Sequence, residues 1–199
     1  MTLKGHAGAV RSVRFSADTR HLITGSDDKT AKVWSLPSRK FVCSLVGHTN
    51  WVRATEFSPD ASTAVTCGDD KLVKLWDVAT HRELHTFYDH VDVVNQALFF
   101  PDGRCVASGS ADNTIKVWDT RSHQLIHHYP AHAGPVTSIS VHPSGNYLLS
   151  TSKDATIKVR ATSSRSSCLS PLLFLLPSLT LSPSLHLALH PHYAPPGLP

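Results

Sequence analysis

The stretch Gly109-Ser110-Ala111-Asp112-Asn113-Thr114-Ile115-Lys116-Val117-Trp118-Asp119 decides the fold, because it belongs to a unit that recurs every 42 residues. The same interval separates equivalent histidines, aspartates and tryptophans along the chain: His6, His48, His90 and His132; Asp28, Asp70, Asp112 and Asp154; Trp34, Trp76 and Trp118. The next tryptophan is due at position 160, where the sequence has Arg160. A repeat of this length predicts equivalent units that stack against their neighbours.

Within each unit, short apolar runs alternate with turn-forming residues. Every first run opens on a valine: Val10, Val52, Val94 and Val136. A turn such as Pro101-Asp102-Gly103 follows, in which proline presets the first dihedral, aspartate can bond its own backbone and glycine takes a positive φ. Further runs follow, the fourth of them from Arg39 to Leu45 in the first unit. Short strands separated by regular turn signals predict an all-β fold.

The third run of each unit carries a lysine between apolar neighbours: Lys32, Lys74, Lys116 and Lys158. Alternation of apolar and polar residues is typical of a strand with one packed and one solvated face. We therefore expect these lysines to line a solvated strand face rather than a binding site.

The first two units have a Gly-His pair near their start, as in Gly47-His48, and the second and third units have Trp-Asp at the end of the third run, as in Trp76-Asp77. In these features the repeat resembles the WD-repeat family, whose repeats are blades of β-propellers. The resemblance predicts an incomplete propeller over residues 1–160, with blades of four-stranded antiparallel sheet at about 5–46, 47–88, 89–130 and 131–160. The last blade is expected to have three strands and to end at Val159.

Residues 161–199 differ in composition from the repeats. They hold 11 Leu, 8 Ser and 7 Pro, with Arg165 as the one charged side chain. The apolar run Leu172 to Leu176 is too short to span a membrane, and prolines interrupt the others. Low-complexity sequence without strand or helix periodicity predicts an unstructured tail. Because the change falls beside the missing Trp-Asp, we interpret the tail as sequence read through an intron or out of frame.

Composition and charge exclude several classes of function. The formal net charge is +4, with no dense Lys/Arg cluster, which argues against nucleic-acid binding. Cys43, Cys67, Cys105 and Cys168 lack CxxC spacing, which indicates a reducing compartment. Met1 to Lys4 leads directly into the first repeat without a signal peptide. We therefore expect a soluble intracellular protein, in the cytosol or nucleus, without membrane association.

Each unit also contains a hydroxyl residue between its histidine and its aspartate, giving four sets: His6/Thr24/Asp28, His48/Thr66/Asp70, His90/Ser108/Asp112 and His132/Ser150/Asp154. These are the residue types of a hydrolase triad. A catalytic site needs one activated nucleophile in one cleft, whereas four equivalent copies indicate a repeated structural network. In that interpretation the aspartate accepts from the histidine, and the hydroxyl bridges the histidine to the indole N–H of Trp34, Trp76 or Trp118. We therefore expect no enzyme activity.

No cofactor, metal or small-molecule substrate is predicted. The four repeated histidines lie one per blade and so would not converge on a metal. His127-His128 and the tail histidines His186, His190 and His192 lack a Cys or carboxylate set at ligand spacing. The sequence contains no glycine-rich phosphate loop of the P-loop or dinucleotide type.

The positions that flank the opening valine, and the one before the repeated aspartate, vary from unit to unit. In a propeller they share the face formed by the loops before first strands and between second and third strands. The predicted protein-binding face comprises Arg11, Asp27, Trp51, Arg53, Asp69 and Asn95. Trp51 stands out because aromatic residues are frequent interface anchors, although it could instead pack against a neighbouring blade. The arginines and aspartates could simply pair with one another, which would contribute little.

Two runs carry a narrower resemblance. Gly47-His48-Thr49-Asn50-Trp51-Val52-Arg53 with Phe57-Ser58-Pro59-Asp60, and His142-Pro143-Ser144-Gly145-Asn146-Tyr147-Leu148-Leu149, are similar to blades of centriolar WD-repeat proteins with seven-bladed propellers. The resemblance implies a non-enzymatic scaffold for centriolar or microtubule-associated proteins in centriole or basal-body assembly and cilium formation. It implies a location in the cytoplasm and cytoskeleton, at the centrosome, centriole or cilium basal body. The alternative is a substrate-recruiting subunit of a ubiquitin ligase.

The predicted arc of four blades has two open edges, which favour aggregation or self-association. The fourth blade is expected to be the least stable, because Arg160 replaces the indole that would complete its network.

Overall fold

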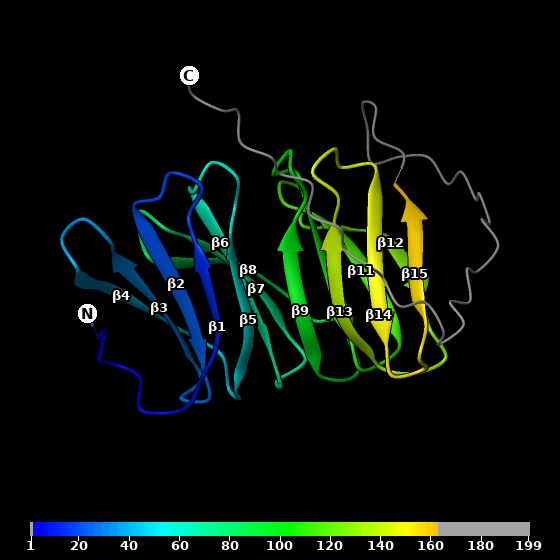
Figure 1. The fold of residues 1–199 in the computed structure, drawn as a ribbon, viewed down its shortest axis with the longest axis horizontal. Coiled ribbons are helices and arrows are strands. Elements are labelled where there is room, and N and C mark those ends of the chain that lie inside the picture. The colour runs from blue at the N-terminus through cyan, green and yellow to red at the C-terminus, as the bar shows by residue number, and fades with distance from the viewer. Residues whose placement is uncertain (1, 163–199) are drawn as a thin grey trace, which may run out of the picture.

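The computed structural model describes residues 2–162, which form fifteen strands in four antiparallel sheets arranged side by side as an arc (Figure 1). Each sheet is one blade, and its strands follow one another in sequence order. The bounds are β1 Val10–Phe15, β2 His21–Ser26, β3 Thr30–Ser35 and β4 Lys40–Val46 in blade 1; β5 Val52–Phe57, β6 Thr63–Gly68, β7 Val73–Asp77 and β8 Arg82–Phe87 in blade 2; β9 Val94–Phe99, β10 Cys105–Ser110, β11 Thr114–Asp119 and β12 Leu125–Pro130 in blade 3; and β13 Val136–Val141, β14 Tyr147–Ser152 and β15 Ile157–Ala161 in blade 4.

The prediction of an all-β fold with four repeated blades and three strands in the last one is confirmed. Two strands differ slightly in their bounds from the sequence-based expectation: β4 spans Lys40–Val46 rather than Arg39 to Leu45, and β15 continues past Val159 to Ala161. The predicted unstructured tail lies, from residue 163 onward, outside the described residues.

The turns between first and second strands form where the sequence predicts them. Gly103 and Gly145 have φ of 70° and 73°, the left-handed conformation that glycine adopts without a steric penalty. The equivalent residues Thr19 and Ala61 take φ of 59° and 58°, although they carry a Cβ. In their turns Ser16 and Ser58 each donate a hydroxyl bond to the aspartate two residues on, which helps to hold this geometry.

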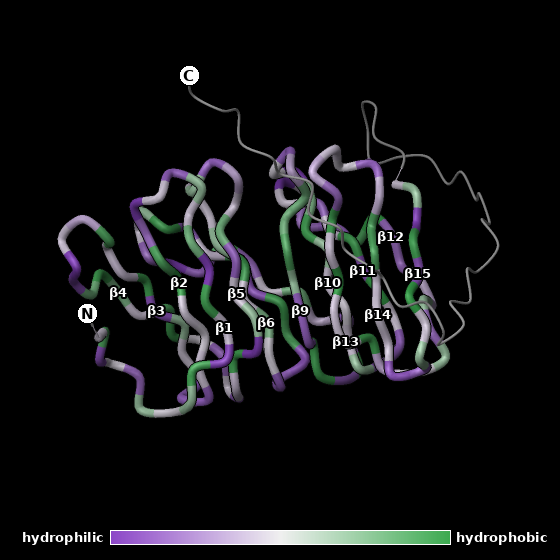
Figure 2. The backbone as a smooth tube through the Cα atoms, viewed as in Figure 1, coloured by the Kyte–Doolittle hydropathy of each residue, from purple (hydrophilic) through white to green (hydrophobic). Residues whose placement is uncertain are grey.

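The apolar core lies between neighbouring blades. We call the side of a blade that faces the following blade its trailing face, and the opposite side its leading face. At the first junction Ile23 and Val33 on the trailing face of blade 1 pack with Phe57 and Trp76 on the leading face of blade 2. Equivalent residues form one cluster at the junction of blades 2 and 3, and another at that of blades 3 and 4. Figure 2 shows hydrophobic residues along the strands and hydrophilic ones in most of the connecting loops.

The lysine column corrects one prediction, because these residues do not line a solvated face. Lys74 and Lys116 are buried, and Lys32 and Lys158 are half-buried. Interior blades are covered on both faces, so the ammonium groups need protein partners. Lys74 donates to Glu83 and Thr86, both at 2.8 Å. The other three donate to the hydroxyl of Ser44 or to backbone carbonyl oxygens.

Candidate functional site

The predicted His–hydroxyl–Asp sets come together as continuous hydrogen-bonded chains, as blade 2 shows. The indole N–H of Trp76 donates to Thr66 Oγ1 at 2.8 Å. Because an indole nitrogen can only donate, the Thr66 hydroxyl is free to donate onward to His48 Nε2, 2.7 Å away. His48 Nδ1 then donates to Asp70 Oδ2 at 2.7 Å. Each polar side chain in this series of hydrogen bonds thereby has a partner.

The carboxylate of each set also accepts a backbone N–H from the residue after the histidine, for example Thr49 N to Asp70 Oδ2 at 3.0 Å. The network therefore ties the loop before a first strand to the turn between the second and third strands. The same arrangement recurs in the other blades, with His Nδ1–Asp Oδ2 distances of 2.7 Å for His6, 2.7 Å for His90 and 2.9 Å for His132.

Hydrogen bonding lowers the pKa of all four repeated aspartates. Burial of Asp112 acts to raise its pKa, but bonds from His90 and Thr114 outweigh it, so the pKa lies well below the usual range. Burial likewise opposes the bonds at Asp28 and Asp70, where the net shift is also downward. At Asp154, the Thr156 hydroxyl bond is the largest cause of a lowered pKa. These carboxylates are therefore ionised acceptors at neutral pH.

The geometry of these sets is unsuited to nucleophilic catalysis. The hydroxyl oxygens of Thr66 and Ser108 belong to residues with no exposed surface, and each already accepts from an indole. A nucleophile must reach its substrate in a cleft that also holds an oxyanion. The sets are instead repeated clamps that fix the loops of each blade.

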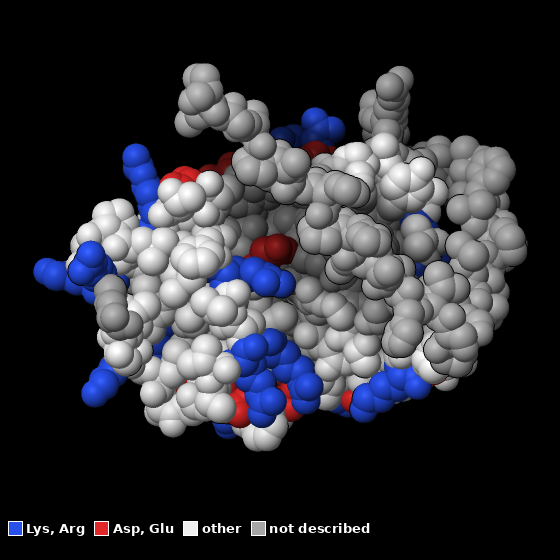
Figure 3. Space-filling model, in the orientation of Figure 1, with Lys and Arg blue, Asp and Glu red and all other residues white. Residues whose placement is uncertain are grey.

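The six residues of the predicted protein-binding face lie around the loops at one end of the blades, and most of them contact one another. Arg11 forms a two-pronged ion pair with Asp27, at 2.5 and 2.8 Å. Arg53 pairs in the same way with Asp69, and its second amino group lies 3.4 Å from Asn95 Oδ1. In Figure 3 basic side chains with acidic ones beside them gather along the lower edge of the molecule.

The six residues of this face differ in their exposure to solvent. Arg11 and Trp51 are exposed, whereas Asp27, Arg53, Asp69 and Asn95 are half-buried, because pairing turns them toward one another. Trp51 is 40% exposed, and the Arg11 guanidinium carbon lies 4.8 Å from the centre of its ring. This stacking couples blade 1 to blade 2, so Trp51 both packs against a neighbouring blade and presents surface to solvent.

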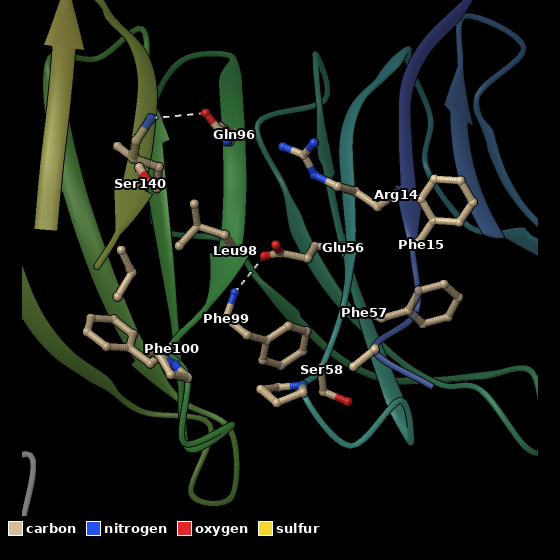
Figure 4. Close-up of a pocket in the computed structure, with 15 residues that line it drawn as sticks. Arg14, Phe15, Glu56, Phe57, Ser58, Gln96, Leu98, Phe99, Phe100 and Ser140 are labelled. Carbon is tan, nitrogen blue, oxygen red and sulfur yellow. Dashed lines mark hydrogen bonds between the residues drawn. The ribbon is translucent and has the colours of Figure 1, made fainter. Parts of the chain in front are cut away.

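Sequence analysis missed the polar side chains of the concave wall formed by the first strands. Glu56 Oε2 accepts the backbone N–H of Phe99 in the next blade at 2.9 Å. Gln96 does the same for Ile139 at 3.0 Å. They lie beside a cavity of about 370 Å³ (Figure 4), where Glu56 points inward between Arg14 and Leu98. The sequence signal that could have predicted these contacts is a polar residue, Glu56 or Gln96, at an inner position of a first strand.

The wall also contains an unusual carboxyl group. Burial raises the pKa of Glu56, and the Phe99 N–H and the charge of Arg14 oppose this only in part.

Among the described residues, no group of three or more His, Cys, Asp or Glu side chains is placed to hold a metal ion. The described residues likewise contain no helix long and apolar enough to cross a membrane.

Repeated four-stranded blades with a Trp–hydroxyl–His–Asp clamp define a β-propeller type of repeat protein. The WD40 family, described as "WD domain, G-beta repeat", matches residues 1–35, 39–77, 81–119 and 123–160. The chain therefore belongs to the WD40 repeat family, whose members are in general non-enzymatic scaffolds for protein–protein interaction.

A segment of the chain is also similar to the vegetative incompatibility protein HET-E-1 of Podospora anserina. The two are 54% identical over 37 residues. The matched segment is 19% of this chain and spans 3% of the length of that relative.

Proposed function

We propose that this WD40 chain binds a partner protein across the face that contains Trp51. The exposed Trp51 ring carries the proposal, since aromatic residues in a rigid setting are the usual anchors of interfaces. The Arg11 stacking and the two Arg–Asp pairs hold the surroundings of the ring in one geometry. A preorganised surface loses less conformational entropy on binding.

The charge pattern favours a particular chemistry for the partner. Asp27 and Asp69 already neutralise the two arginines, so the face is not simply basic. A partner gains little by supplying carboxylates to arginines that are already paired. An apolar or aromatic side chain that covers the Trp51 ring, surrounded by hydrogen-bonding groups, suits this face better.

We further propose that the partners are centriolar or microtubule-associated proteins, and that the chain serves centriole or basal-body assembly and cilium formation. The resemblance of residues 47–53, 57–60 and 142–149 to centriolar WD-repeat proteins supports this proposal. The corresponding location is the cytoplasm and cytoskeleton, at the centrosome, centriole or cilium basal body. The alternative proposal is a substrate-recruiting subunit of a ubiquitin ligase.

Affinity purification with mass spectrometry tests both the binding face and the identity of the partners. It uses the full chain, a Trp51→Ala variant and a Leu84→Ala control. Leu84 is similarly exposed on the outer strand of the same blade, away from the proposed face. We expect Trp51→Ala to lose the partners that Leu84→Ala retains, and an identical set in both variants would contradict the binding face. Centriolar and tubulin-linked proteins support the first proposal, whereas cullin and adaptor subunits support the alternative.

A further inference from the structure

The two ends of the blade arc expose apolar residues whose equivalents are mostly buried in the other blades. On the leading face of blade 1, Val10 is 54% exposed, whereas its equivalents Val52, Val94 and Val136 are at most 1% exposed. Phe15 is 69% exposed, whereas the equivalent Phe57 is 5% exposed. The sequence at this face is therefore that of a packed junction, although no described residue covers it.

The trailing face of blade 4 is uncovered in the same way. Ile157 is 53% exposed and Val159 49%, whereas the equivalents of both are no more than 3% exposed in each of the other three blades. Leu149, at 36%, corresponds to residues that are fully buried in blades 1 to 3. An apolar face of this kind marks an interaction surface.

The three internal junctions show what covers each of these faces. In every one, a leading face packs on a trailing face: the first strand of one blade contacts the second and third strands of the blade before it, joined at the first two junctions by Trp76 or Trp118. Hydrogen bonds between a side chain of one blade and the backbone of the following blade also cross the junctions. In one of them, the backbone N–H of Phe99 donates to Glu56. The leading face of blade 1 and the trailing face of blade 4 are thus the two complementary halves of one such junction.

We propose that a second copy of this chain covers both faces. Blade 1 of each copy packs on blade 4 of the other, so that two chains form one ring of eight blades with two head-to-tail junctions. Eight blades lie within the size range of known propellers, and a head-to-tail contact closes when its rotation completes a ring. Closure buries all the exposed apolar side chains of both free faces and leaves neither chain with an uncovered blade.

One contact of the new junction is tighter than its internal counterparts. A Cβ at Gly25 would lie 2.9 Å from the Thr55 side chain, so the internal junction requires a small residue there. The equivalent position in blade 4 holds Thr151, which would face Val13 of the second copy. Two β-branched side chains then meet where the first and third internal junctions have Gly25 or Gly109 opposite a branched residue, and the second has Cys67 opposite Ala97. The added bulk of Thr151 should therefore weaken the pairing.

The test is the mass of the full chain in solution, measured by light scattering and sedimentation over a concentration series. The chain has a mass of 21.7 kDa, and we expect a species of twice that mass whose fraction rises with concentration. Thr151→Gly should shift the transition to lower concentration. A chain that stays at 21.7 kDa at every concentration overturns the proposal, including the case in which residues 163–199 cover the trailing face.

Two charged variants determine which faces meet. Val10→Asp and Ile157→Asp should each be monomeric, whereas Val91→Asp, at a valine that is 74% exposed in a loop outside both faces, should still pair. An equimolar mixture of the first two should recover a two-chain species, because one of its two junctions is unmodified on both sides. Circular dichroism of each variant establishes that it is folded. If only Val10→Asp abolishes pairing, like faces pair with like, and the head-to-tail arrangement is wrong.

Discussion

Arg160 places its guanidinium carbon 4.9 Å from the centre of the Tyr129 ring. It pairs with Leu148 across the sheet, as Trp34 pairs with Leu22 in blade 1, so it occupies the tryptophan position of its blade. The arginine keeps a contact with the preceding blade but cannot supply the indole N–H that the other three clamps use. Its Nε is buried without a hydrogen-bond partner, and Ser150 lacks the donor that Thr24 receives from Trp34.

Arg160→Trp should therefore stabilise the protein. The indole N–H would reach Ser150 Oγ, and a net hydrogen bond of this kind contributes about 1 kcal/mol to the free energy of unfolding. Arg160→Phe is the matched control, since it supplies a ring without the donor. Chemical denaturation should place the tryptophan variant above the phenylalanine variant, and equal midpoints would argue against a missing donor.

Blade 4 should also open more readily than the others. Its clamp lacks the indole, and His132 Nδ1 divides its bond between Asp154 and Thr156 at 2.9 and 3.0 Å. Amide hydrogen exchange should show weaker protection in β14 and β15 than in β6 and β7, because local opening exposes the least-supported element first. Equal protection across all four blades would contradict this prediction.

His48→Ala should destabilise blade 2 by about 2–4 kcal/mol, because it leaves Thr66 and Asp70 each short of one buried partner. His128, exposed on β12, is the control, and its replacement by alanine should leave the thermal midpoint nearly unchanged. A midpoint for His48→Ala that matches the control would show that the clamp contributes little to stability.

The clamp aspartates predict a loss of stability in acid. Their pKa values are lower in the folded chain than in the unfolded chain, where the value is about 3.9. The stability they contribute is therefore fully present above the unfolded pKa and is lost as the pH falls through it toward the folded value. Thermal melts on either side of this range should show the fall. Asp112→Asn should make it shallower, and an unaltered slope would assign the acid sensitivity to other groups.

The titration of Glu56 should affect stability in the opposite direction to that of the clamp aspartates. Its pKa is raised in the fold by burial, so the stability associated with its protonated form is present below the unfolded pKa and is lost as the pH rises through the folded pKa. Glu56→Gln keeps an acceptor for Phe99 N and removes the buried charge. The variant should melt higher than the natural chain at neutral pH, with a difference that shrinks in acid. A lower melting point at neutral pH would show that the charge itself stabilises the wall.

The period of 42 residues determined most of the fold. Because residues 42 apart are equivalent, the positions of valine, turn residues, lysine and tryptophan in one unit predict the strands of all the units. These strands lie between residues 10 and 161. The histidine, hydroxyl and aspartate of each clamp were predictable for the same reason: polar groups buried at equivalent positions must find equivalent partners.

Only the tertiary structure decided what depends on contacts between blades. Lys74 is polar by sequence but buried by position, because the neighbouring blade covers its face. Arg11 stacks on Trp51, and Glu56 bonds to Phe99 N, through residues at positions where the blades differ. A repeat establishes which residues occupy the same place in each unit. The pairing of unlike residues across a junction depends on how the units are stacked in space.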